Sequence, residues 1–413
     1  MPFKETCAVE ERVRFCVAVD EGEATMSELC RQFEISRKTG YEVYGRWRSG
    51  GTAAVLARSH APHHCPHGLD DARRAAILGV RHAHPTWGPK KVKAWLERKR
   101  SDAVWPATST IGDLFNREGL SVARKMRLRT SPRTQPFANC LAPNDIWSMD
   151  FEGWFRTGNG HRCDPFTLQD QNSRYLLRVV PVARTDSAHV WAVLDAAFRE
   201  YGLPVTMRSD NGPPFASKGA GGLSSLSVML VKAGVIPERI DPASPQQNGR
   251  LERLHLTLLQ DSASPPAASV RAQAERFRAF RETYNGERPH EALGLATPAS
   301  VYAASDRRWS GRLRSPEYDV GVHVRRVRTT GEIKWRNGLV YVSEALIGER
   351  VGITETEDSR FELRFGPVLL GDIMPDLTLR RPRAVCASGR RWRGALSTHS
   401  AQSNPESVTH HPG

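Results

Sequence analysis

Residues 146–155 read IWSMDFEGWF, a run in which apolar and polar side chains largely alternate around Asp150. Alternation with a period of two is typical of a half-buried β-strand. A Gly-Asn-Gly turn at residues 158–160 predicts a hairpin to residues 164–170, and a third strand is expected over residues 174–181. The pattern therefore predicts three successive antiparallel strands, with Asp150 in the middle of the first one.

Helices and strands are expected to alternate after this meander. We expect a helix that Thr185 or Asp186 caps and Gly202 ends, and then a strand that finishes at Asp210. The remaining expected elements are a helix around residues 226–233, a strand over 236–240 and a helix from about residue 247 that carries Glu252. This order resembles an α/β RNase H-like domain with a mixed five-stranded sheet.

Three carboxylates in this region lie on three different rigid elements: Asp150, Asp210 and Glu252. Two divalent ions can promote phosphodiester cleavage and transfer by clamping the attacking and leaving oxygens. Mg²⁺ prefers hard oxygen ligands and keeps several waters, so two or three carboxylates suffice. Each residue taken singly is also compatible with a surface acid, and Asp210 with a turn-forming residue. The order strand, strand end, helix favours a metal-binding catalytic triad with two Mg²⁺ or Mn²⁺ ions.

Three short blocks resemble the D,D(35)E integrase core of retroviral integrases and bacterial insertion-sequence transposases: residues 147–151 (WSMDF), 209–215 (SDNGPPF) and 245–253 (PQQNGRLER). Residues 284–302 resemble the closing motif of the bacterial branch, most closely the insertion-sequence 481 group, which is related to the insertion-sequence 3 group. The resemblance extends over about residues 70–375.

The resemblance implies an enzyme that binds element ends, hydrolyses a phosphodiester to free a 3′-OH and transfers that end to another DNA. Asp150 would bridge both metal ions, and Asp210 and Glu252 would hold one each. Two DNA ends must be held together, so a homo-oligomer on terminal inverted repeats and target DNA is expected. The expected location is the bacterial cytoplasm, in association with the nucleoid.

Departures from the family pattern keep two alternatives open. Glu152 stands where a basic residue is expected, and residues 256–261 (LTLLQD) lack the usual Lys or Arg. More residues separate Asp210 from Glu252 than the 35 that give the D,D(35)E motif its name. Residues 217–222 are interpreted as the loop that holds the extra residues. One alternative is a degenerate transposase that acts only as a sequence-specific DNA-binding protein. The other is a nuclease that hydrolyses DNA without joining it.

Residues 1–57 are predicted to form a helix-turn-helix domain, followed by a linker at 58–70. Apolar residues share one face of a helix over 27–33, and Ser36 can cap the next helix. A plain three-helix bundle end would show the same spacing. The predicted DNA contacts stand at the start of the second helix: Arg37, Lys38, Thr39 and Tyr41.

Residues 71–123 are predicted to form a second helix-turn-helix, either plain or winged, and 124–144 a basic linker. A helix is expected over 71–83, and Thr108 is the expected cap of a recognition-type helix. The linker would lie along phosphates or be a flexible connection. Further predicted DNA contacts are Lys90, Lys91, Thr108, Arg124, Lys125, Arg127, Arg129, Arg250 and Arg253.

The catalytic core is assigned to residues 145–305, and short strands with tight turns predict a small SH3-like β-barrel at 316–376. Residues 377–413 are expected to be a disordered basic tail with nonspecific DNA affinity. Within the core, Trp147 and Trp154 both fall in the strand alternation, which favours burial in the core over a role as base-stacking platforms.

Composition is consistent with a DNA-binding protein. The 413 residues carry a formal net charge of +14, which favours a polyanionic partner. Seven scattered cysteines without a CxxC pair predict free thiols in a reducing compartment. No apolar run is long enough to span a membrane, and the N-terminus lacks the apolar segment of a secretory signal, so neither feature is expected.

Overall fold

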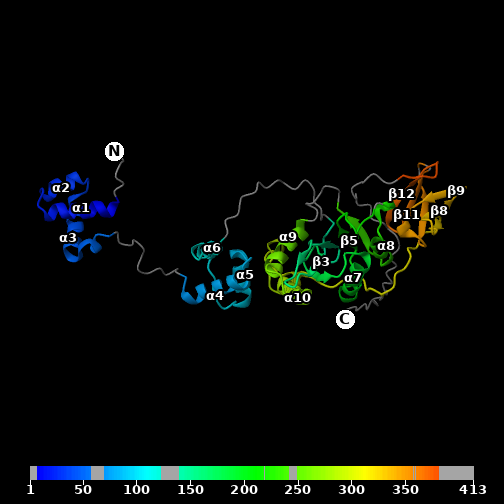
Figure 1. The fold of residues 1–413 in the computed structure, drawn as a ribbon, viewed down its shortest axis with the longest axis horizontal. Helices are drawn as coiled ribbons and strands as arrows, with labels where there is room; N and C mark the ends of the chain where they lie inside the picture. Colours follow the sequence, from blue (N-terminus) through cyan, green and yellow to red (C-terminus); the bar gives the residue numbers. More distant parts are fainter. Residues whose placement is uncertain are drawn as a thin grey trace, which may run out of the picture. The chain divides into compact units, whose positions relative to one another are not determined.

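The computed structural model describes residues 7–56, 69–121, 139–217, 219–240, 249–356, 358 and 360–380. The chain divides into two compact units, Met1–Leu69 and Asp70–Gly413. Each is described by itself below, with the elements labelled as in Figure 1. In the described part of the chain, no helix combines the length and the apolar character needed to cross a membrane.

The first unit is a three-helix domain, which confirms the first predicted helix-turn-helix fold. Its helices are α1 (Ala8–Asp20), α2 (Met26–Gln32) and α3 (Arg37–Ala54). Thr25 and Glu28 form a capping box at α2, and the Ser36 hydroxyl accepts from the Thr39 amide at 3.1 Å, as predicted for the cap of α3. The core of this unit packs buried side chains from all three helices, including Phe15, Leu29 and Val43.

The second unit begins with another three-helix segment: α4 (Asp71–Ala83), α5 (Pro89–Lys99) and α6 (Thr108–Arg117). Pro89 opens α5 in the first turn, where its missing N–H costs no hydrogen bond. The predicted cap of α6 is wrong, because Ala107 occupies the N-cap position and Thr108 is the first helical residue. No strand occurs within residues 69–121, so this part of the structure contains no wing.

A mixed sheet forms the centre of the second unit. Its strands are β1 (Ile146–Phe151), β2 (Phe155–Arg156), β3 (Arg162–Asp170), β4 (Leu176–Val182), β5 (Thr206–Ser209) and β6 (Ile236–Arg239). β3 pairs antiparallel with β1, β2 and β4, whereas β5 pairs parallel with β1 and β6. β1 therefore lies between β3 and β5, and β2 is a short addition to the predicted five-stranded sheet.

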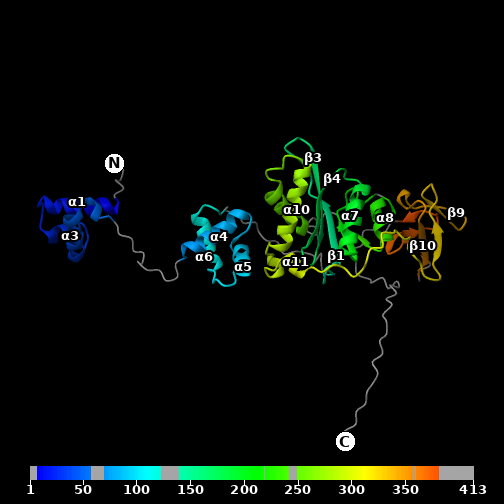
Figure 2. The same cartoon turned by 90° about the horizontal axis from the view of Figure 1, so that it is seen from below.

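Two helical layers cover this sheet. One layer contains α7 (Ser187–Tyr201) and α8 (Ser225–Lys232), and the other contains α9 (Gly249–Leu258) and α10 (Val270–Gly286). Figures 1 and 2 show the strands between these layers. The connecting short helices are η1 (Ala220–Gly222), the π-helix η3 (Leu259–Ala263), η4 (Glu291–Leu293) and α11 (Pro298–Val301).

Local sequence signals explain the ends of α7. Asp186 caps its N-terminus by accepting from the His189 amide at 2.9 Å, and Gly202 ends it with a φ of 77°. The apolar stripe of α7 packs on Trp147, Met149 and Phe166 in the main core. The predicted loop at residues 217–222 contains the η1 turn at its end.

The C-terminal strands form an open sheet and a separate hairpin. The sheet runs β13-β12-β11-β10-β7, and β8 pairs only with β9. Among the described residues these strands do not close, so the predicted small β-barrel is not found. Side chains from α8 and η1 join the core of this sheet. The elements are β7 (His323–Arg326), β8 (Glu332–Trp335), β9 (Gly338–Tyr341), η5 (Glu344–Leu346), β10 (Arg350–Glu355), β11 (Phe361–Phe365), β12 (Val368–Ile373) and β13 (Leu379–Arg380).

Candidate active site

Asp150 lies near the end of the central strand β1, opposite Thr167 of β3. The neighbouring residues Trp147 and Met149 are buried in the α7–α8 layer, so the alternate residue Asp150 faces the α9–α10 layer. One carboxylate oxygen of Asp150 accepts from the Phe151 amide at 2.8 Å. A mid-sheet backbone therefore holds this carboxylate.

Asp210 follows β5 directly, on the strand beside β1. Ser148 of β1 is in register with Arg208 of β5, so two residues further along each strand Asp150 and Asp210 stand at the same level. Neighbouring strands are about 4.8 Å apart. The Asp210 carboxylate accepts from the Gly212 amide at 3.1 Å, and burial raises its pKa. Sheet topology thus places the two aspartates side by side and keeps Asp210 in a turn.

Glu252 stands in the first turn of α9, with an exposed side chain. The buried residues Leu251, Leu254 and Leu258 pack α9 onto the face of β3 and β4. His255 lies one helical turn after Glu252, and residues three apart on a helix are neighbours. Glu252 is therefore on the sheet face that carries Asp150, on a helix anchored by its leucines.

A hydrogen-bonded chain ties α9 to β1. Nε2 of His255 lies 2.8 Å from Oγ1 of Thr167, which in turn donates to the Asp150 carbonyl at 3.1 Å. Burial lowers the pKa of His255 to about 4, so the imidazole is neutral at physiological pH. No local pattern in the sequence indicates that Thr167 faces His255, so this hydrogen bond could not be predicted from the sequence.

Glu152 follows the last residue of β1 and continues the alternation of polar residues after Ser148 and Asp150. Both of its carboxylate oxygens are buried, and within the described structure neither has a hydrogen-bond partner. Burial raises the pKa of Glu152 to about 8, so its carboxyl is largely uncharged at neutral pH. The position where a cation was expected therefore holds a neutral acid.

The three carboxylates suit Mg²⁺ or Mn²⁺ by donor chemistry, because all offer hard oxygens on one face of the sheet. In the described part of the chain, however, no three carboxylate, imidazole or thiolate groups are gathered closely enough to hold a metal ion. The exposed side chain of Glu252 is the one that would have to turn toward the two aspartates.

The predicted contacts of the first helix-turn-helix lie together on its surface. Arg37, Lys38, Thr39 and Tyr41 are all exposed at the start of α3. The Thr39 hydroxyl is also 2.8 Å from that of Ser36, so part of its hydrogen-bonding capacity is used in the cap. The structure keeps this face accessible to a ligand.

Of the two lysines at the start of α5, Lys90 is exposed and Lys91 is partly buried. Nζ of Lys90 is 3.9 Å from a Glu291 carboxylate oxygen. Burial, with a smaller contribution from Arg288, lowers the pKa of Lys91 to about 8. Thr108 is half-buried at the start of α6. Lys91 therefore belongs to a contact within the second unit, whereas Lys90 stays accessible to a ligand.

This contact joins the α4–α5 region to the end of α10. Arg98 donates to the Glu287 carbonyl at 2.6 Å, and Trp95 to the Glu287 carboxylate at 3.3 Å. Arg288 pairs with Asp261 at 3.1 Å, and the Thr86 hydroxyl donates to the same carboxylate at 3.3 Å. Asp261, which departs from the expected basic pattern, is thus a structural ion-pair partner.

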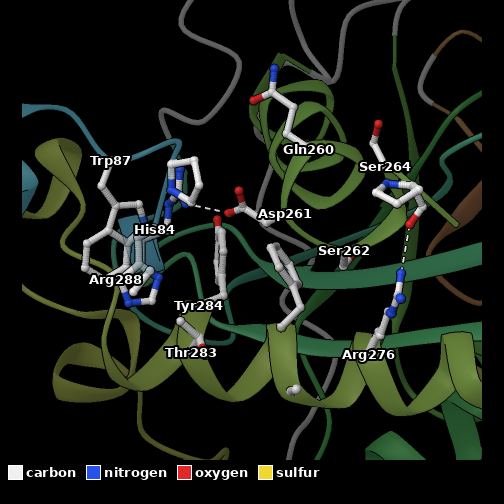
Figure 3. A pocket seen from close by; sticks show the side chains of 15 residues that line it. His84, Trp87, Gln260, Asp261, Ser262, Ser264, Arg276, Thr283, Tyr284 and Arg288 are labelled. Carbon is white, nitrogen blue, oxygen red and sulfur yellow. Dashed lines mark hydrogen bonds and ion pairs between the residues drawn. The ribbon is translucent and has the colours of Figure 1, made fainter. Parts of the chain in front are cut away.

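A cavity of about 530 Å³ lies beside this ion pair (Figure 3). His84 stacks on Trp87 at one side, with ring centroids 3.9 Å apart. Tyr284 and Arg276 of α10 line the other side, and Arg276 donates to the Pro265 carbonyl at 2.8 Å. The cavity therefore separates the second three-helix segment from the helix layer of the active face.

The other predicted contacts differ in accessibility. Arg250 donates to the Gln171 carbonyl at 2.6 Å and is half-buried, whereas Arg253 is exposed. Burial lowers the pKa of Arg250 to about 10. Four predicted contacts lie outside the described residues: Arg124, Lys125, Arg127 and Arg129.

The two tryptophans of the first strand differ. Trp147 is fully buried, as predicted, but Trp154 is 56% exposed, so the prediction that it lies in the core is wrong. β1 ends at Phe151, and Gly153 adopts a φ of 105° before β2 begins. This glycine within the alternating pattern is the local signal that could have indicated a break in the strand.

Family models match most of the described core. Two models described as Integrase core domain match residues 141–245 and 233–298. A Helix-turn-helix domain model matches residues 11–63, and a Homeodomain-like domain model matches residues 39–115. The matches cover the helices predicted to bind DNA and the core that carries the three carboxylates.

Two similar proteins come from bacterial insertion elements. An uncharacterized 31.7 kDa protein of insertion element IS407 from Burkholderia multivorans is 26% identical over 68% of this chain and 95% of its own length. An uncharacterized 39.2 kDa protein of IS476 from Xanthomonas euvesicatoria is 29% identical over 44% of this chain and 50% of its own length.

Among solved structures, the HTLV-2 integrase catalytic core domain in complex with magnesium is 18% identical to this chain. The match covers 40% of this chain and 99% of that one, with a TM-score of 0.29.

Proposed function

Because the chain belongs to the insertion-sequence transposases of the integrase-core superfamily, we propose that it binds the ends of a mobile element and catalyses their strand transfer. The observation that carries this proposal is the pairing of β1 with β5, which sets Asp150 and Asp210 side by side. Glu252 stands on the helix that packs over the same face. Such a set of carboxylates is suited to phosphoryl transfer.

We propose that Asp150, Asp210 and Glu252 would together hold divalent metal ions. When bound, Mg²⁺ or Mn²⁺ would supply charge stabilisation for the attacking and leaving oxygens of the phosphodiester. The protein's own contribution is to hold Asp150 and Asp210 side by side and to keep the helix of Glu252 over the same face. The His255–Thr167 hydrogen bond fixes the distance of α9 from β1, and the Gly212 amide orients Asp210.

The proposed reaction has two steps at this site. In the first, water attacks the phosphodiester at the element end, and the bond to the 3′ oxygen breaks to leave a free 3′-OH. In the second, that 3′-OH attacks a target phosphodiester, and another 3′ oxygen leaves. DNA ends would be held by the exposed start of α3, and joining two ends requires more than one copy of the chain. The nucleoid of the bacterial cytoplasm is the proposed place of action.

A degenerate transposase that only binds DNA is the second candidate function. The exposed position of Glu252 favours it, because within the described residues no three carboxylates are held together as a preassembled metal site. The third possibility, a nuclease, differs only in its product, since it would hydrolyse ends without joining them.

The test is an incubation of the full chain with labelled DNA that carries its own element's ends, with Mn²⁺ present. Asp210→Asn and Glu252→Gln are expected to abolish nicking and joining while end binding remains. Glu275→Gln, an exposed carboxylate on α10 in a surface ion pair, is the matched control and should react like the wild type. Transfer retained in Asp210→Asn would refute the assignment. Binding without cleavage by the wild type would favour the DNA-binding relic, and nicking without joined products would favour the nuclease.

A further inference from the structure

Trp154 is an exposed aromatic residue on the hairpin that extends β1. Of its surface, 56% is accessible, although it follows the buried strand by only three residues. The positive φ of Gly153 turns the chain out of the sheet before β2 starts at Phe155. Single exposed apolar side chains are normal on protein surfaces, so a binding role for this indole depends on the groups around it.

Two guanidinium groups lie over the Trp154 ring. The Cζ atoms of Arg162 and Arg156 are 5.0 and 5.8 Å from its centroid. The β2–β3 pairing sets these two arginines opposite each other across the hairpin. We define the Trp154 platform as Trp154, Arg156 and Arg162.

The arginines of the Trp154 platform are held in place. Arg162 donates twice to the Asp164 carboxylate, at 2.7 and 2.6 Å, and Arg156 donates to the Gly160 carbonyl at 2.8 Å. The Asp164 side chain neutralises Arg162, so Arg156 supplies the excess positive charge of the hairpin. Since these bonds already fix the guanidinium planes, a ligand that stacks on the platform would order few additional groups.

The platform is close to the proposed reaction centre. Trp154 follows Asp150 by four residues, and four residues of extended chain reach at most about 14 Å. One DNA strand advances about 3.4 Å for each base pair, so this reach corresponds to about four nucleotides. A nucleotide within a few positions of the reacting phosphodiester can therefore meet the indole.

A hollow of about 480 Å³ adjoins Arg162. It is lined by the hairpin on one side, with Asn159 and His161, and by the start of α10 on the other, with Ser269 and Arg271. Arg271 is almost fully exposed. The lining is mixed, with apolar residues beside the cationic Arg162 and Arg271. The two arginines suit the phosphate of a nucleotide whose base lies on the platform.

We propose that the Trp154 platform stacks an unpaired base of the DNA strand that occupies the active site. Every base offers a π-face, and aromatic side chains beside cations are how proteins hold single strands without reading their sequence. A base inside an intact duplex offers no free face, so the platform acts on a frayed or extruded nucleotide near the cleaved end. This inference rests on the proposed function for the identity of the strand.

The first experiment measures stacking without chemistry. A twelve-residue oligothymidylate with one central 2-aminopurine is titrated with the full chain in the absence of divalent metal. The wild type is expected to quench the fluorescence, and Trp154→Ala to bind about 5- to 150-fold more weakly with the quenching lost, the loss typical of one stacked base. Trp154→Phe should retain most of the quenching. Tyr341→Ala, which removes an aromatic side chain of similar exposure (52%), is the control and should match the wild type.

The second experiment locates the platform on the element end. 2-Aminopurine is placed at successive positions from the cleaved phosphodiester in duplex ends, bound by the Asp210→Asn protein. We expect quenching at positions within about four nucleotides of that bond. The quenching should be lost when Trp154→Ala is combined with Asp210→Asn. Equal quenching with and without Trp154, or no response of the wild type to single strands, would overturn the proposal. If the platform stacks bases but the wild type never cleaves ends, the proposed function fails while the platform stands.

Discussion

Removing one partner of the ion pair between Asp261 and Arg288 should cost far more stability than removing one partner of a surface pair. The side chains are 22% and 8% exposed, and their atoms approach to 3.1 Å. Arg288 also lies 3.4 Å from the Thr86 hydroxyl, and its Cζ atom is 6.0 Å from the centroid of the Tyr284 ring. Asp261→Ala therefore leaves a buried guanidinium with weak, uncharged partners in place of a carboxylate. Burial already lowers the pKa of Arg288, which shows that its charge is poorly solvated.

Breaking a buried pair by removing one partner costs about 3–5 kcal/mol. Because the Asp261 side chain keeps some contact with water, we expect a loss at or below the lower end, about 2–3 kcal/mol. Replacing both partners, in Asp261→Leu with Arg288→Met, should restore most of that loss, since no uncompensated charge then stays buried. The exposed Arg271–Glu275 pair is the control, and Glu275→Ala should cost no more than about 1 kcal/mol.

The assay combines denaturant unfolding of the single and double variants with hydrogen exchange. Amides of residues 84–91 should exchange faster in Asp261→Ala, because Thr86 loses its acceptor, and should be unchanged in Glu275→Ala. If Asp261→Ala costs less than about 0.5 kcal/mol, or if the double variant shows no coupling, the pair is not buried between these segments and the reasoning is refuted.

Three further predictions concern charge, positioning and DNA. Lys91→Met should stabilise the protein by ~1–2 kcal/mol at pH 7, a figure already discounted for partial exposure. The folded pKa of Lys91, about 8, lies below the ordinary lysine value, so the stability of the wild type rises from pH 8 toward 10 and the advantage of the variant should disappear there. A stability difference between variant and wild type that stays constant over these pH values would contradict this. His255→Ala should slow single-turnover nicking by about 10- to 100-fold while end binding stays intact, and Thr167→Val should also slow nicking. Unchanged nicking rates would show that the hydrogen bond between His255 and Thr167 does not position α9. Arg37→Ala and Lys38→Ala should each weaken end binding and reduce the slope of log affinity against log salt concentration by about 1. Gel shifts at several salt concentrations measure this slope, and an unchanged slope would show that the DNA binds elsewhere.

Local patterns in the chain were sufficient for most elements of the fold. Strand alternation located β1, and Asp186 and Gly202 marked the ends of α7, because a cap depends on residues within one turn. The relative order of Asp150, Asp210 and Glu252 likewise followed from the order of the elements that carry them. The Ser36 cap of α3 could be predicted for the same reason as the ends of α7, because it too depends on residues within one turn.

Errors arose where one local signal competed with another. Alternation placed Trp154 in the core, but Gly153 interrupts the strand just before it. Thr108 was a reasonable cap by residue type, yet the helix includes it and begins after Ala107. Strand signals after residue 316 were correct for most strands, but whether a sheet closes depends on pairing between its first and last strands, and β7 and β13 do not pair.

By itself, the sequence determined the kind of elements, their order and the presence of three carboxylates on rigid supports, because periodicity and capping act between residues a few positions apart. Only the tertiary structure decided which charges are buried and what they meet. Asp261 is paired with Arg288 and bonded to Thr86, 175 residues away in the chain. Lys91 faces the core rather than solvent, and Glu152 is enclosed beside Asp150. Desolvation and long-range pairing depend on distant segments coming together, and no local pattern records which segments do so.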